Sequence, residues 1–356
     1  MSQDKYVDRS AYDHLRFGGF HRTTNIWGED RIVGEVPPID IVLDVFYVPW
    51  ENHGRWGVFD RAGRVVEAAV DRALPDGQLL QQVVESPVSY DNIAVKAIEG
   101  DYVYGGRFHP HFGHFLVEAL PRYWQLARQP LENRKIVVHT NAHYNFFADF
   151  PFARSIFSVL DLRAESFIDF QVPVRLDRLE IPHVSLRPQA FAYEAYGELC
   201  RYIGRKLLAE RSIDRNDKPV WLSKTKLKHG VSVFANELIV EDYLRKHDVD
   251  IVYPEELSFE DQLYLFSSRT TIAGTTGSAF HSAVFVENNP RIIMIDPVGF
   301  KNSNFSILDK LMKIESEHYF PSGTEMIQLD GFLRAVAFPE PEAVADEILR
   351  TIRRVP

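Results

Sequence analysis

Strands alternate with helices over short connections in residues 218–297. Apolar runs such as PVWLS, VDIVY, TTIAG and RIIMIDP are separated by stretches with helical periodicity, such as NELIVEDYLRKH and SFEDQLYLFSS. This alternation is typical of βαβ units, in which helices cover both faces of a parallel sheet. We therefore predict a Rossmann-like second half.

The first half has a different pattern and begins with short strands. Residues 39–95 contain apolar runs broken by turn signals such as DRAGR and LPDGQ, which predicts a β-rich opening. Later apolar runs alternate with helical stretches, so we expect this half to be mixed α/β. The predicted organisation is an N-terminal α/β domain (1–192), a linking helix and linker (193–217), a C-terminal Rossmann-like domain (218–338) and a final helix (339–356).

Composition and charge limit the class of protein. The chain has 356 residues, more than one hydrophobic core usually organises, which favours two domains. Its 50 acidic residues outnumber its 40 basic residues, so the net charge of -10 opposes nucleic acid as a partner. No apolar stretch reaches the roughly 18 residues of a membrane span, and no signal-peptide pattern is present. With Cys200 as its single cysteine, the chain is expected to be cytoplasmic, without an integral membrane segment.

The densest polar cluster follows a Gly/His-rich loop. It contains His109, His111, His114, Glu118 and Arg122. If a helix begins near Gly113, the last three of these residues lie at positions i, i+4 and i+8 on one face. An imidazole beside a carboxylate suits a general base. Surface helix pairs and a histidine-capped loop would give the same pattern, and the H-x-H-x-x-H spacing leaves zinc open as a minor alternative.

Two loops at the carboxyl ends of predicted strands suit an anion. Ligands of doubly wound sheets bind at that edge. The first loop, SKTKLKHG, is cationic and begins at Ser223, while the second holds Gly274 and Gly277 at the start of a predicted helix. A solvated basic loop and an ordinary tight connection are the alternatives. Neither G-x-G-x-x-G nor the P-loop motif is present, and the D-x-D string at 248–250 falls in a predicted turn.

Three blocks of sequence follow one another along the chain. They are GGRFHPHFGHFLVEALPRYWQL (105–126), WLSKTK with ANELIVEDYL (221–244), and the stretch from LSFEDQ to RIIMIDP (257–297). Together these blocks resemble glycosyltransferase family 61, and in particular its bacterial capsular and exopolysaccharide branch. The resemblance covers most of residues 105–297.

This resemblance implies a fold and an activity. The fold is GT-B-like, with two facing Rossmann-like domains, the N-terminal one here preceded by the β-rich segment. The activity is inverting transfer of a sugar from a nucleotide sugar to a saccharide or glycolipid acceptor, in bacterial surface polysaccharide biosynthesis. The resemblance implies no metal and no cofactor. It is compatible with peripheral association with polysaccharide assembly machinery.

The resemblance also assigns roles to residues. Glu118, aided by His114, would take the proton from the acceptor, which His109, His111 and Arg122 would contact. The donor and its diphosphate would be bound by Ser223, Lys224, Asn236, Glu237, Gly277, Ser278 and His281. Lys224 stands where the family usually has Arg, and Thr276 stands where a His commonly precedes Gly277.

Two other functions remain open at the level of sequence. A catalytically silent member of the same fold would bind a saccharide or nucleotide and act as a regulator or scaffold. A zinc-dependent hydrolase built on His109, His111 and His114 is a minor alternative.

Overall fold

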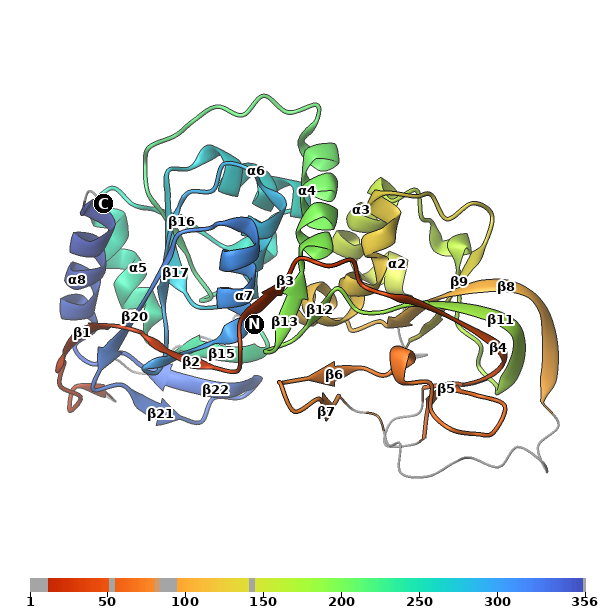
Figure 1. The fold of residues 1–356 in the computed structure, drawn as a ribbon. Coiled ribbons are helices and arrows are strands. Elements are labelled where there is room, and N and C mark those ends of the chain that lie inside the picture. Colours follow the sequence, from red (N-terminus) through yellow and green to blue (C-terminus); the bar gives the residue numbers. More distant parts are fainter. Residues whose placement is uncertain (1–11, 51–54, 81, 83–94, 141–144, 355–356) are drawn as a thin grey trace. The chain divides into compact units, whose positions relative to one another are not determined.

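The computed structural model describes residues 12–50, 55–80, 82, 95–140 and 145–354 (Figure 1). The chain forms two compact units, each assembled from separate stretches. Unit 1 comprises Met1–Trp27, Leu208–Asn302 and Lys313–Pro356, and unit 2 comprises Gly28–Leu207 and Ser303–Met312. The predicted linking segment, residues 193–217, contains one of the points at which the chain passes between units. The GT-B arrangement and the other domain limits stay predictions.

Unit 1 is built around a six-stranded sheet with the order β16-β14-β17-β18-β20-β1. In that order, the strands are Asp250–Val252, Val220–Leu222, Thr271–Thr275, Arg291–Ile295, Ser316–Ser322 and Gly19–Arg22. The first five are parallel, and β1 pairs with β20 in the antiparallel sense. Numbered along the chain, the parallel strands are ordered 2-1-3-4-5, as in flavodoxin-like doubly wound sheets. The predicted βαβ alternation is found in this unit.

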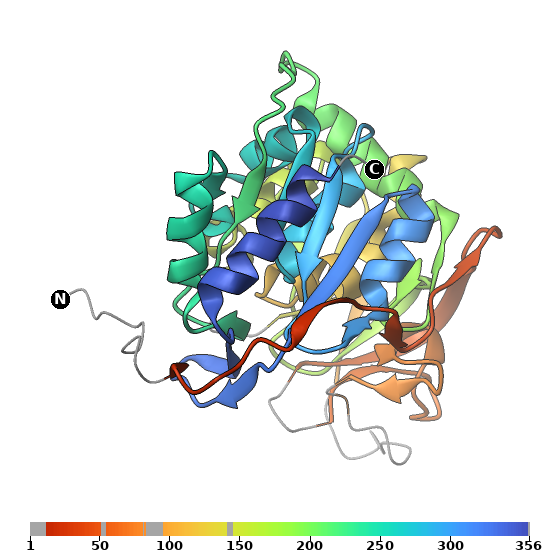
Figure 2. The same cartoon turned by 90° about the vertical axis from the view of Figure 1, so that its left-hand side faces the viewer.

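Helices cover both faces of this sheet. They are α5 (Glu237–Lys246), α6 (Phe259–Ser268), α8 (Pro341–Arg353) and the 3-10 helix Ser278–Phe285. Figure 2 shows α5 and α8 lying together over one face, where Trp221, Val240 and Ile348 belong to one buried apolar core. In Figure 1, α6 lies on the opposite side of the strands. The rings of Phe259 and Phe285 join α6 to the 3-10 helix, with centroids 5.2 Å apart.

Two small sheets complete unit 1. One has three strands, β15 (Gly230–Phe234), β22 (Phe332–Ala337) and β21 (Glu325–Ile327). The other is a parallel ribbon of β2 (Asn25–Trp27) and β19 (Phe300–Asn302). The unit therefore draws strands from both ends of the described chain.

Unit 2 contains a mixed sheet with the order β10-β9-β8-β11-β4-β5. In that order, the strands are Phe167–Ile168, Lys135–His139, Lys96–Arg107, Val174–Pro182, Ile39–Val48 and Gly57–Phe59. The first four are parallel to one another, and β4 runs antiparallel to both of its neighbours, β11 and β5. The antiparallel strands β4 and β5 belong to the predicted β-rich opening, and the parallel strands β8 to β11 follow it in the chain. The mixed α/β class itself is confirmed.

Unit 2 also contains further strands and α-helices. They are β3 (Arg31–Val33), β6 (Arg72–Ala73), β7 (Gln78–Leu79), β12 (Leu186–Arg187), β13 (Phe191–Tyr193), α1 (Phe112–His114), α2 (Phe146–Asp149), α3 (Pro151–Val159), α4 (Glu194–Leu208) and α7 (Ser303–Met312). The late helix α7 packs against β3 and β13. The predicted β-rich opening is found as β4 to β7, and its residues 83–94 lie outside the described residues.

A buried histidine closes the core of unit 2 at the end of β9. His139 is bonded through both ring nitrogens: Nε2–H donates to the carbonyl of Val48 and Nδ1 accepts from the hydroxyl of Tyr104, each at 3.0 Å. Its ring stacks on Tyr47, with centroids 4.3 Å apart. Burial lowers the pKa of His139 to about 3. The imidazole is therefore neutral in the folded protein.

Replacing His139 with Gln is expected to weaken the acid dependence of stability. The unfolded chain binds a proton at His139 near pH 6.5, but the folded chain binds it only near pH 3. Wild type therefore loses roughly 1.4 kcal/mol of unfolding free energy per pH unit as pH falls below ~6.5, and the variant lacks this contribution. Urea unfolding between pH ~7 and pH ~4 measures the effect. A constant difference between the two proteins across that range would contradict a neutral His139.

Candidate functional site

An irregular helix follows the loop at the end of β8 in unit 2. It consists of α1, a π-helical turn (Phe115–Ala119) and a 3-10 helix (Leu120–Ala127). The sequence predicted one helix with a kink at Pro121. Because Pro121 has no N–H to donate to the carbonyl of Val117, the α-helical ladder cannot continue through this point, and the helix changes type there. The backbone of this stretch is therefore less regular than the single kinked helix that the sequence predicted.

Within this helix, His114 and Glu118 form a hydrogen-bonded pair. Nδ1 of His114 lies 2.5 Å from Oε1 of Glu118, so Nδ1–H donates to the carboxylate and Nε2 keeps its lone pair. Oε2 of Glu118 accepts from Nη2 of Arg107 at 2.8 Å. The side chain of His114 is 44% exposed, whereas those of Glu118 and Arg107 are 7% and 2% exposed. The imidazole is the outward-facing end of this group.

The environment of Glu118 keeps its carboxylate ionised. Burial alone would raise the pKa of Glu118, but the hydrogen bond and charge of His114 and the charge of Arg107 outweigh burial, so the pKa lies below its ordinary value. Both carboxylate oxygens already accept hydrogen bonds. Glu118 is thus a fixed negative charge behind the imidazole.

Two further imidazoles flank His114. The ring centroids of His109 and His111 lie 4.4 and 5.3 Å from that of His114. Nδ1 of His109 accepts from the backbone N–H of His111 at 3.1 Å. Burial, followed by the charge of His114, lowers the pKa of both, that of His109 to about 4. Both rings are therefore neutral at pH 7, where they suit an uncharged ligand that carries hydroxyl groups.

Arg122 turns away from His114 and Glu118 into the interior. Its side chain is 0% exposed, and its guanidinium donates to backbone carbonyl groups and to the carboxylate of Asp71, at 3.3 Å. A π-helical turn holds more residues than an α-helical turn, so residues beyond it are rotated off the face that i, i+4 and i+8 spacing predicts. The predicted shared face is confirmed for His114 with Glu118 and is wrong for Arg122.

Asp71 and Arg107 extend the pair into a buried chain of alternating charges. The carboxylate of Asp71 lies 3.6 Å from Nε of Arg107 and 3.3 Å from Nη2 of Arg122. Gly106, with φ +78°, leaves room for this arrangement, because a Cβ there would lie 2.8 Å from Cδ of Arg122. Sequence reasoning missed both Asp71 and Arg107. Arg107 stands within the histidine block and could have been found there, whereas nothing in the sequence around Asp71 points to it.

In unit 1, two predicted loops meet at the edge of the sheet. The strand order reverses between β14 and β17, which is where ligands of doubly wound sheets bind. Lys224 follows β14 and reaches the loop after β17, where its Nζ donates to the carbonyl of Thr276 at 2.5 Å. Gly277 lies against this side chain, since a Cβ at Gly277 would lie 2.7 Å from Cε and 2.9 Å from Nζ of Lys224. The structure thus brings Lys224 and Gly277 together.

Lys224 is coupled electrostatically to Glu237, the first residue of α5. Burial lowers the pKa of Lys224 and raises that of Glu237, and each partner's charge opposes the shift of the other. Oε1 of Glu237 accepts from the indole N–H of Trp221 at 3.0 Å. The ammonium itself donates to neutral carbonyl groups, those of Thr276 and Ser232. An anion beside Nζ would supply a stronger acceptor.

The other predicted residues of unit 1 have mainly internal positions. The hydroxyl of Ser223 donates to a buried carboxylate of α5. The side-chain amide of Asn236 pairs with the backbone N–H and carbonyl of Phe338, at 2.8 and 2.9 Å. Ser278 begins the 3-10 helix after Gly277, and His281 within it is 7% exposed. Ser223 and Asn236 therefore hold the loops in place.

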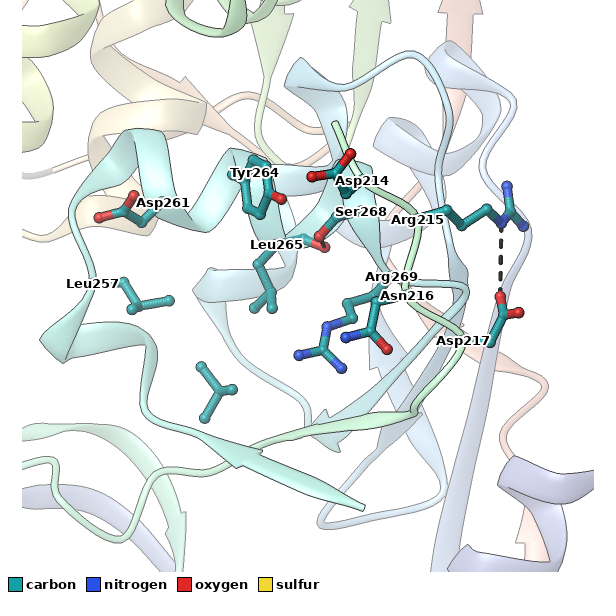
Figure 3. Close-up of a pocket in the computed structure, with 11 residues that line it drawn as sticks. Asp214, Arg215, Asn216, Asp217, Leu257, Asp261, Tyr264, Leu265, Ser268 and Arg269 are labelled. Atoms are coloured by element: carbon teal, nitrogen blue, oxygen red, sulfur yellow. Dashed lines mark hydrogen bonds and ion pairs between the residues drawn. The ribbon is translucent and has the colours of Figure 1, made fainter. Parts of the chain in front are cut away.

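A cavity of about 580 Å³ lies elsewhere in unit 1. It is lined by residues 214–217, by part of α6 and by Arg269 (Figure 3). The guanidinium of Arg269 is engaged by Asp250, at 2.9 Å, and the guanidinium of Arg215 is paired with Asp217. None of the predicted site residues lines this cavity.

The described part of the chain shows neither a metal-binding cluster nor a membrane-spanning helix. No group of three or more His, Cys, Asp or Glu side chains there is placed to hold a metal ion. Among the same residues, no helix has both the length and the apolar character needed to cross a membrane.

Comparison with known proteins identifies the family. The family model described as glycosyltransferase 61 matches residues 112–293, just over half of the chain. The chain therefore belongs to glycosyltransferase family 61, and this membership supports glycosyltransferase activity. The match includes the His114–Glu118 pair in unit 2 and the Lys224–Gly277 contact in unit 1. A search of curated proteins found no match.

Replacing Gly277 with Ala is expected to destabilise unit 1 only while Lys224 is present. Gly277 has an extended backbone with φ -170°, which any residue adopts; the added Cβ would clash with Lys224, whereas its distance of 3.7 Å to the carbonyl oxygen of Thr275 is ordinary contact. We expect a loss of about 1–3 kcal/mol in wild type and almost none in a Lys224→Ala background. Urea unfolding of wild type, Gly277→Ala, Lys224→Ala and the double variant measures this dependence of one substitution on the other. Gly34→Ala is the control, because no atom lies within 4 Å of its added Cβ. An equal loss in both backgrounds would contradict the contact.

Proposed function

We propose that this protein is an inverting glycosyltransferase that moves a sugar from a nucleotide sugar to a hydroxyl group of a saccharide or glycolipid acceptor. The observation that carries the proposal is the pair of His114 and Glu118, in which a buried carboxylate holds an exposed imidazole. Such a pair suits the removal of a proton from a hydroxyl group. Family membership supports the reaction class.

In this proposal His114 takes the proton from the acceptor hydroxyl group, and Glu118 holds the imidazole of His114 in position. Nε2 of His114 accepts the proton as the acceptor oxygen attacks the anomeric carbon, and the bond to the diphosphate breaks on the opposite side, which inverts the configuration. Glu118 stabilises the imidazolium that forms, while Arg107 keeps Glu118 ionised. The sequence had favoured Glu118 as the base, but both of its oxygens already accept hydrogen bonds.

Lys224 and the backbone near Gly277 would receive the diphosphate of the donor. Negative charge grows on the leaving group as the glycosidic bond breaks, so a positive group there stabilises the transition state more than the substrate. The ammonium of Lys224 now donates to carbonyl oxygens, and a phosphate oxygen would form a stronger, charge-assisted bond. With this countercharge supplied by the chain, we propose a reaction that needs no metal ion.

We further propose a place for this reaction in the synthesis of bacterial surface polysaccharide. The support is the resemblance of three sequence blocks to the capsular and exopolysaccharide branch of the family. A cytoplasmic protein in peripheral association with the assembly machinery would fit this role. Its acceptor would be a growing saccharide or its lipid-linked form.

Glu118→Gln is expected to lower turnover by about 10²–10⁴. The amide oxygen can still accept from Nδ1 of His114, but the negative charge that stabilises the imidazolium is lost. Initial rates of nucleoside diphosphate release measure the effect, and calorimetry should give unchanged binding of the nucleoside diphosphate. Glu325→Gln is the matched control, because Glu325 makes an exposed pair with His14 at 3.0 Å. Near-normal turnover of Glu118→Gln would refute the assignment.

Lys224→Ala is expected to weaken nucleoside diphosphate binding by roughly ten- to a hundred-fold, because one charge-assisted hydrogen bond is lost. Binding of the uncharged nucleoside should be almost unchanged. Lys224→Arg should retain binding if the site has room for a guanidinium. Isothermal titration calorimetry tests all three proteins. Lys226→Ala is the control from the same loop, since Lys226 is paired with Glu256 at 2.9 Å. Wild-type affinity in Lys224→Ala would remove the donor assignment.

A further inference from the structure

Trp50 lies next to the buried charges of unit 2. It is outside the three sequence blocks that resemble the family. The residue follows β4 and is half-buried. The guanidinium of Arg107 lies over its ring, 5.7 Å from the ring centroid. Since Arg107 also binds Glu118, the indole belongs to the same group of contacts as the proposed base.

The indole of Trp50 rests on a fixed support. Trp56 contacts it edge to face, with centroids 6.2 Å apart, and Trp56 is itself 0% exposed. Trp56 packs in turn on His139 at the end of β9, at 4.9 Å. Trp50 is therefore an aromatic ring held in place by buried groups while part of its surface stays open.

A sugar ring presents an apolar face and polar hydroxyl groups. Trp50 suits the first, and the histidines suit the second. One face of a pyranose carries C–H groups that pack on an aromatic ring, while its hydroxyl groups need hydrogen bonds. His109 and His111, both neutral, supply polar atoms beside the proposed base, and Trp50, linked to that base through Arg107 and Glu118, supplies an aromatic surface. A charged side chain in place of these neutral groups would be less suited to binding an uncharged sugar.

We propose that Trp50 binds the acceptor by stacking against the sugar ring whose hydroxyl group is deprotonated by His114. This inference rests on the proposed function and deepens it, because it names a neutral pyranose as the group bound beside the base. Trp50 is an acceptor-binding residue here, and Arg107 holds it in position.

The direct test uses fluorine NMR of the full chain labelled with 5-fluorotryptophan. The five tryptophans give separate resonances, and the one absent from Trp50→Phe belongs to Trp50. Methyl glycosides of glucose, galactose, xylose and N-acetylglucosamine are titrated into the millimolar range. We expect a saturable shift of the Trp50 resonance with at least one glycoside. The resonance of Trp27, which is 50% exposed, should not move and serves as the control. No shift of Trp50 with any of the four overturns the proposal.

A kinetic test separates this inference from the proposed function. Trp50→Ala should raise the KM for the acceptor about tenfold or more, Trp50→Phe should recover most of the loss, and Trp27→Ala should have no effect. If turnover depends on His114 while Trp50→Ala leaves the acceptor KM unchanged, the inference fails and the function stands. If Trp50 binds glycosides but Glu118→Gln has normal turnover, the role assigned to Glu118 fails and Trp50 stands as a glycoside-binding residue.

Discussion

A buried chain of alternating charges, Arg122–Asp71–Arg107–Glu118, determines the form of the site in unit 2. Its two positive and two negative groups balance, and each is at most 7% exposed. Removing one partner from such a network leaves an uncompensated charge in the interior, at a typical cost of about 3–5 kcal/mol. The network ends at the surface on His114. It therefore fixes the direction of one imidazole with groups drawn from β8, the irregular helix and the segment before β6.

This network explains several residues of the first sequence block, residues 105–126. In GGRFHPHFGH, Gly106 admits the side chain of Arg122 and Arg107 carries the charge that faces Glu118. In ALPR, Pro121 interrupts the helix and Arg122 fills the interior. Only His114 and its neighbours face outward. Most of the residues named in these two strings therefore hold His114 in position.

Sequence patterns predicted the parts of this protein that depend on local periodicity. The parallel sheet of unit 1 follows from apolar runs of a few residues alternating with helical stretches, and the His114–Glu118 contact follows from i, i+4 spacing. The inward turn of Arg122 was missed because a π-helical turn inside the helix changes which residues share a face. Asp71 and Trp50 were missed for a different reason. Each reaches the site through contacts between segments far apart in the chain, such as Trp50 with Arg107, which no local pattern encodes.

The pairing of β1 with β20 has a consequence for how the chain is made. β1 is among the first described residues to leave the ribosome, yet its partner, Ser316–Ser322, follows some three hundred residues later. Unit 2 likewise waits for α7, which packs against β3 and β13. Domains that are continuous in sequence can fold one after the other during synthesis. Here unit 2 cannot be completed until α7 has been made, and unit 1 cannot be completed until β20 and α8 have been made, so both units acquire their last elements late in synthesis.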